Sequence, residues 1–174
     1  RGGSGEEYIL FKRNLEKVFT GQNVEDDATM FSIVRRLLRG AALATFNNKV
    51  AEYSEEIDAV FEVGMRAVRD SAFPKRAISK QKRYMRRHMH KGINAPFKTF
   101  LNRVQEINNY FMEMPPNVPV DDGEVEEPPS GMPEDDLMDI LEFACPTEWQ
   151  KQMRLQDFDT SVKSFEELLN FCEN

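Results

Sequence analysis

Two histidines are the side chains in this sequence best suited to bind a metal ion. His88 and His90 are two residues apart. On a helix this spacing separates the two imidazoles by about 200° around the axis, so they do not converge on one ion. The sequence also has no cysteine and histidine pattern with zinc-knuckle spacing. We therefore expect no metal site, and two solvated histidines in a basic stretch.

Clustered carboxylates are the next candidates for chemistry. Asp121-Asp122-Gly123 and Asp159-Thr160-Ser161 faintly resemble the loops of aspartic proteases. Such a site needs a β-rich fold that holds two carboxylates against each other, whereas strand signals are nearly absent here. The sequence also lacks a Gly-rich phosphate loop and a nucleophile elbow. We therefore expect no catalytic residue, no bound cofactor and no enzymatic activity.

Charge is distributed very unevenly along the 174 residues, although the net charge is only −7. Residues 75–103 contain ten lysines and arginines and no acid, and residues 121–142 contain ten acids and no base. The basic stretch predicts contact with RNA or another polyanion through the phosphate backbone. The alternative is a solvated helix face that pairs with the acidic segment of the same or a neighbouring chain. The predicted contact residues are Lys75, Arg76, Lys80, Lys82, Arg83, Arg86, Arg87 and Lys91.

Helices must position these groups, and helical periodicity recurs along most of the chain. Apolar stripes and caps predict helices near residues 6–19, 27–46, 54–72, 76–91, 96–111, 133–144, 146–153 and 164–173. In the second of these helices, Gly40 is a candidate position for a kink. Phe73-Pro74 ends the third helix, because the residue before proline disfavours helix. Most of the prolines lie in an acidic break at 114–133, which predicts a flexible loop. We therefore predict an all-α protein of two small bundles.

The domain boundary and the two ends of the chain follow from the same pattern. We expect a flexible linker at 1–5, an N-terminal helical domain at 6–73, and a C-terminal helical domain at 74–174 that carries the acidic loop. Phe73 and Pro74 are the expected hinge. No apolar run is long enough to span a membrane. Cys145 and Cys172 are expected to be reduced thiols, and a disulfide would require their Cα atoms to lie within about 7 Å.

Four stretches in order carry a resemblance to a known family. Residues 30–46 combine an apolar helix, a Gly-Ala step and an aromatic residue. Residues 97–108 contain a Phe, Arg and Asn pattern, residues 137–149 a helix followed by Pro146 and Trp149, and residues 164–168 a final capped helix. Together they resemble the two-lobe capsid region of long-terminal-repeat retrotransposon Gag proteins of the gypsy and copia type. A more distant similarity is to the capsid domain of the neuronal Arc protein.

This resemblance implies a structural protein that self-assembles into hexamers and pentamers and packages RNA in cytoplasmic virus-like particles. The implied partners are further copies of the chain and RNA, with no membrane. A second possibility is a domesticated, Gag-derived adaptor that binds partner peptides in a groove. The residues that form the expected core signature are Phe31, Leu37, Gly40, Phe46, Phe100, Val104, Leu141, Pro146, Trp149 and Leu168.

Overall fold

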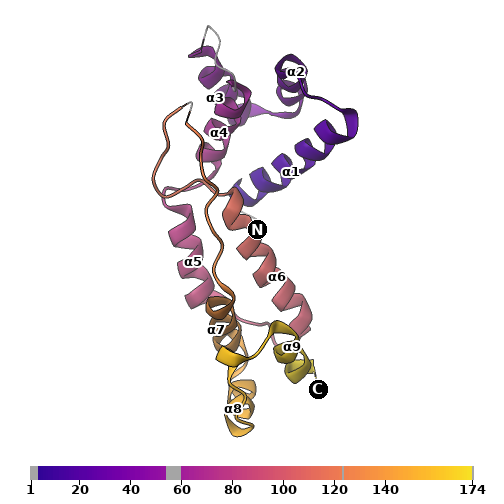
Figure 1. The fold of residues 1–174 in the computed structure, drawn as a ribbon, viewed down its shortest axis with the longest axis vertical. Helices are drawn as coiled ribbons and strands as arrows, with labels where there is room; N and C mark the ends of the chain where they lie inside the picture. The colour runs from indigo at the N-terminus through magenta and orange to yellow at the C-terminus, as the bar shows by residue number, and fades with distance from the viewer. Residues whose placement is uncertain (1–3, 54–59, 123, 174) are drawn as a thin grey trace. The chain divides into compact units, whose positions relative to one another are not determined.

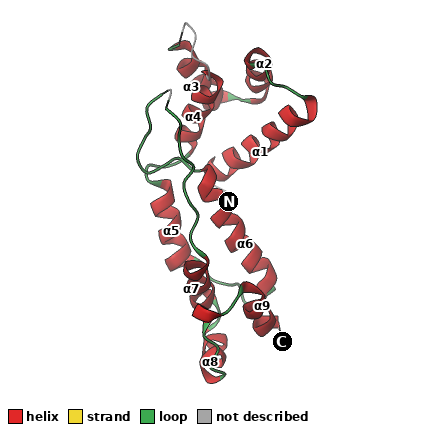
Figure 2. Cartoon of the chain, in the orientation of Figure 1, coloured by secondary structure: helices red, strands yellow, loops and turns green. Residues whose placement is uncertain are grey.

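The computed structural model describes residues 4–53, 60–122 and 124–173, and within them it contains helices and no strand (Figure 2). The predicted all-α class is therefore confirmed. The α-helices are α1 (Ser4–Gln22), α2 (Asp27–Leu37), α3 (Gly40–Ala51), α4 (Val60–Ala72), α5 (Ala77–His88), α6 (Phe97–Tyr110), α7 (Glu134–Ala144), α8 (Thr147–Leu155) and α9 (Phe165–Glu173). Two 3-10 turns, η1 (Phe111–Glu113) and η2 (Thr160–Val162), complete the described elements (Figure 1).

The chain divides into two compact units, and neither unit is one continuous stretch of sequence. The first consists of Arg1–Ala77 and Glu113–Pro129, and the second of Ile78–Met112 and Ser130–Asn174. The sequence predicted two domains that meet near Pro74, with the acidic loop in the second. In the structure most of that loop belongs to the first unit, because its carboxylates and carbonyls are bonded to α3 and α4.

Aromatic side chains form the core of the first unit, in which α3 packs against α4 and α1 and α2 also contact α4. The Phe46 ring is fully buried, and its centroid lies 5.6 Å from that of Phe31 and 6.1 Å from that of Phe61. Phe19 adds a further edge contact to Phe61 at 5.9 Å. Such tilted and edge-on arrangements are favourable for aromatic pairs. Gly64 lies beside the Phe46 ring, where no side chain would fit.

The second predicted helix, 27–46, is wrong as one element because the chain leaves the helix after Leu37. Leu38 and Arg39 adopt extended backbone angles, and Gly40 then begins α3 with a φ of +53°. Glycine adopts this left-handed conformation without a Cβ penalty. The break changes the predicted core, since Leu37 is 50% exposed whereas Leu38 is buried. The helical periodicity predicted Leu37 on the buried face, but α2 ends at Leu37 and Leu38 is the buried residue.

The start of the chain and the expected hinge also differ from the prediction. The first helix begins at Ser4, and Gly5 is buried against the ring of Phe73. That ring makes an edge contact with Tyr8, with centroids 6.3 Å apart. Phe73 and Pro74 thus lie inside the first unit, and the chain passes to the second unit after Ala77. Residues 1–3 of the predicted linker, and Ser54 at the start of the predicted third helix, lie outside the described residues.

Apolar helix faces form the core of the second unit, largely as the periodicity predicts. Val104 and Leu141 are fully buried, as is Leu168 of α9, and Phe100 is also buried. Pro146 and Trp149 are half-buried. The amide of Asn108 fixes the chain before α7, because it donates to the carbonyl of Met132 (3.1 Å) and accepts from its N–H (2.7 Å). The predicted cap of the last helix is confirmed: the Ser164 N–H donates to Glu167 and the Glu167 N–H to the Ser164 hydroxyl.

Candidate polyanion-binding surface

Helix α5 presents its basic side chains in a regular order. Ile78 and Met85 are buried and fix the inner side of the helix. Lys80, Arg83 and Arg87 follow one another at spacings of three and four residues, and all three are exposed. At about 100° per residue they lie opposite Ile78 and Met85. We call these three residues the basic stripe.

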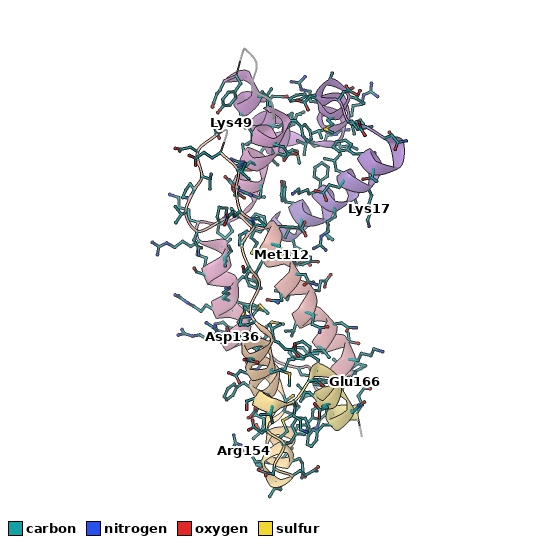
Figure 3. All side chains as sticks on the ribbon, viewed as in Figure 1. Lys17, Lys49, Met112, Asp136, Arg154 and Glu166 are labelled. Carbon is teal, nitrogen blue, oxygen red and sulfur yellow. The ribbon has the colours of Figure 1, made fainter. Side chains whose placement is uncertain are left out.

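The other two basic residues of α5 lie at the flank of the stripe and contact their own unit. The ammonium of Lys82 lies 5.5 Å from the centroid of the Phe111 ring, a cation–π distance. Arg86 forms an ion pair of 2.8 Å with Asp136, which is labelled in Figure 3. Both partners of this pair are substantially exposed, so it contributes little to stability. Within the described part of the second unit, the basic stripe itself has no ion pair.

A single aromatic pair borders the basic stripe. Tyr84 is 48% exposed, and its ring centroid lies 6.0 Å from that of His88, with the planes inclined by 31°. An exposed ring beside cationic side chains offers a face on which a base can stack. The arrangement thus combines phosphate-binding charge with one stacking surface.

The remaining three predicted contact residues do not lie on α5. Lys75 and Arg76 belong to the first unit, where they border a cavity of about 470 Å³ between the end of α4 and the proline-rich segment. Lys91 is only 8% exposed, with its ammonium 4.7 Å from the Trp149 ring centroid and 3.1 Å from the carbonyl of Gly92. Lys91 is therefore excluded from a surface contact, because its charge is enclosed by its own unit.

Acidic residues of the segment 113–129 are bound by cations of the first unit. Asp122 accepts from Lys49 (2.6 Å) and from the Tyr53 hydroxyl. Glu126 forms a two-point ion pair with Arg69, in which the second contact is 2.9 Å long. Figure 1 shows this segment as the orange loop beside α3 and α4. The hydrogen bonds from Lys49 and Arg69 are the main reason that the pKa values of Asp122 and Glu126 are lowered.

This arrangement bears on the alternative interpretation of the basic stretch. Arg66 donates to the carbonyls of Asp121 (3.5 Å) and Glu124 (3.3 Å), so α4 holds the segment by its backbone as well as by its side chains. Two carboxylates of the segment, Asp122 and Glu126, are thus paired with cations that the sequence pattern did not indicate. The available sequence signal for this binding was the pair Arg66 and Arg69, which lie three residues apart and therefore on one side of α4. Among α5 residues, Arg86 pairs with Asp136 of α7, which lies within the acidic stretch 121–142, so the alternative interpretation applies to this residue.

The described residues contain no group of three or more histidines, cysteines and carboxylates able to hold a metal ion. None of the described helices combines the length and apolarity needed to cross a bilayer. No protein-family model, no curated protein and no solved structure matches this chain.

Proposed function

We propose that this chain is a self-assembling, capsid-like structural subunit whose basic stripe on α5 contacts the phosphate backbone of RNA. The observation that carries the RNA contact is the stripe itself: Lys80, Arg83 and Arg87 are exposed on one helix face that contains no carboxylate. Ammonium and guanidinium groups bind phosphate oxygens and release counterions. Such binding is independent of sequence, as packaging of a long RNA requires.

The assembly part of the proposal is supported by the ordered resemblance of four helical stretches to Gag capsids. The division into two compact helical units is compatible with it, because capsid proteins of this kind build shells from two helical lobes. The proposed partners are other copies of the chain, in hexamers and pentamers, and RNA. The proposed location is the cytoplasm, and no catalysis is proposed.

RNA binding can be tested with a single-stranded RNA in fluorescence anisotropy titrations over a salt series. The variant Arg83→Gln/Arg87→Gln removes two charges from the basic stripe. The control Lys17→Gln/Arg154→Gln removes two charges from exposed sites on α1 and α8, both labelled in Figure 3. We expect the stripe variant to lower the slope of log K against log salt by about 0.7 for each lost contact. Equal slopes for the two variants would refute the stripe as the contact.

Assembly can be tested by negative-stain electron microscopy of the purified chain over a salt series, with and without RNA. We expect regular shells or tubes, formed at lower protein concentration when RNA is present. The stripe variant should lose this effect of RNA, while the control should keep it. A chain that stays monomeric under every condition would contradict the capsid proposal.

One observation favours a second candidate, the peptide-binding adaptor. An open hollow of about 560 Å³ is lined by residues of α2 and α3, among them Phe31, Ser32 and Val50. Two arginines, Arg35 and Arg36, border its apolar floor, a combination suited to an apolar peptide with acidic flanks. A peptide-array screen would identify ligands, and Ser32→Trp should abolish their binding by filling the hollow. Ligands that bind equally well to this variant would exclude the hollow.

A further inference from the structure

The two cysteines of the chain, 27 positions apart in sequence, are brought together in the second unit. Cys145 ends α7, where its N–H bonds to the carbonyls of Leu141 and Glu142, and its side chain is buried. Cys172 lies near the end of α9 and is half-buried. Both thiols are free, and they lie within hydrogen-bonding reach of each other.

Contacts around the pair place Lys91 near it. The Lys91 N–H donates to the carbonyl of Ala144 (2.9 Å), which fixes Lys91 beside Cys145. The Lys91 ammonium lies over Trp149, and Trp149 lines an open hollow of about 930 Å³ together with Cys172. Lys91 is therefore close to both cysteines, and the hollow gives solvent access from the side of Cys172.

We propose that Cys145 and Cys172 are a redox pair that forms a reversible intramolecular disulfide, with Lys91 as a positioning residue beside them. The inference is independent of the capsid proposal. It assigns a modification site to Cys145, at the end of α7, and Cys172, on α9.

The local electrostatics determine which sulfur reacts first. The hydrogen bond from Cys172 and the positive charge of Lys91 lower the pKa of the Cys145 thiol, while burial and Glu142 act in the opposite direction. The pKa of Cys172 is raised, mainly by its hydrogen bond to Cys145. These opposite directions favour Cys145 as the sulfur that loses its proton first.

Hydrogen peroxide is small enough to act as the oxidant for this pair. The Cys145 thiolate attacks one peroxide oxygen, the O–O bond breaks, and hydroxide leaves and takes up a proton to form water. The Cys172 sulfur then attacks the sulfenic sulfur of Cys145, the S–O bond breaks, and a second water leaves with the Cys172 proton. In total two thiols are oxidised to one disulfide, and one peroxide is reduced to two waters.

The first test is peroxide treatment of the full chain, followed by intact mass measurement and peptide mapping without reductant. We expect a monomer that has lost two hydrogen atoms and in which the peptides of Cys145 and Cys172 are linked. Reductant should restore both thiols. Because the chain has only two cysteines, Cys145→Ser and Cys172→Ser should each abolish the link. Two unlinked thiols, over-oxidised cysteines, or disulfide-linked dimers alone would overturn the proposal.

The second test separates a preformed pair from chance encounter. The disulfide should form roughly tenfold faster in the native chain than in the urea-unfolded chain, in which a long loop must close first. The oxidised chain should melt about 10 °C higher than the reduced chain. Equal rates in the native and unfolded chains would overturn the preformed geometry.

The role of Lys91 is tested with Lys91→Gln, which keeps most of the stem and a donor for the Gly92 carbonyl. We expect the native oxidation rate to fall roughly threefold, because less of Cys145 is ionised. The control is Lys98→Gln, which removes an exposed charge from α6 of the same unit. A rate that does not differ between these two variants would overturn the role assigned to Lys91.

Discussion

The two units use different interactions to hold their chain segments. In the first unit, the irregular segment 113–129 is held to α3 and α4 by ion pairs and hydrogen bonds, of which Arg69 with Glu126 is the most enclosed, with side chains 12% and 13% exposed. In the second unit, α6 and α7 bury continuous apolar faces. The apolar faces are visible as local periodicity, whereas the ion pairs join residues more than 50 positions apart. Local sequence patterns therefore describe the second unit better than the first.

The largest effect should come from a cavity in the apolar core of the second unit. Leu141 is fully buried on α7, so Leu141→Ala should lower the free energy of unfolding by about 3 kcal/mol. Trp149, the only tryptophan, reports on this unit through its fluorescence. Leu155→Ala is the matched control, because Leu155 is 78% exposed. Similar losses for both variants would contradict a core built from helix faces.

The close fit of α3 against α4 should give the next largest effect. A Cβ at Gly64 would lie 2.7 Å from Cε2 of Phe46 and 2.9 Å from Cγ2 of Val50. Gly64→Ala should therefore destabilise the chain by about 1–2 kcal/mol in thermal unfolding followed by circular dichroism. Gly21→Ala on α1, where no atom lies within 4 Å, should instead be neutral or stabilising. A stabilising Gly64→Ala would show that α3 can move away from α4.

The ion-paired segment should show a smaller and pH-dependent effect. Glu126→Gln should lower the free energy of unfolding by about 1 kcal/mol near pH 7, since the pair is partly solvated. Because the folded pKa of Glu126 is lowered, its stabilisation is present above the unfolded pKa of about 4.3 and is lost as pH falls below that value.

Chemical denaturation at pH 7 and pH 3 would measure this difference. The variant should have a lower free energy of unfolding than the native chain at pH 7, and this difference should be smaller at pH 3. Glu127→Gln is the control, because Glu127 is exposed and adjacent in sequence. A loss of stability that is the same at both pH values would show that the carboxylate charge does not hold the segment.

The smallest effect should come from the cap of α9, an interaction within four residues. Ser164→Ala removes the hydroxyl that accepts from the Glu167 N–H, and should cost about 0.5–1 kcal/mol in thermal unfolding. Ser130→Ala, at an exposed position outside any helix, should have no measurable effect. A loss of stability as large as that of Leu141→Ala would contradict the expectation that a local cap contributes less than long-range core packing.

The sequence predicted the helical class, the positions of α6, α7 and α9, and the inner side of α5. It failed where a distant partner decides the local structure. The segment 114–133 looked unable to order itself because Lys49, Arg66 and Arg69 are not near it in sequence. The prediction placed Leu37 in the core, whereas Leu38 is the buried residue, because periodicity does not show where the backbone leaves a helix.

The candidate surface was predicted in part for the same reasons. Lys80, Arg83 and Arg87 can be read from helical spacing once Ile78 and Met85 fix the inner side. The burial of Lys91 depends on Trp149, which is far away in sequence and follows a turn whose direction no pattern specifies. The proximity of Cys145 and Cys172 likewise depends on how α9 packs.

The discontinuous first unit has a consequence for cutting and joining this polypeptide. The chain passes between the units after Ala77, after Met112 and after Pro129. A fragment that stops at residue 77 would lack Glu126 and Asp122, the distant partners of Arg69 and Lys49. A fragment that starts at residue 78 would carry these two carboxylates without Arg69 and Lys49. A gene fusion that replaces one half of the chain at a single position would therefore separate residues that form ion pairs within one unit. Exchange of an intact unit requires three breakpoints in the gene.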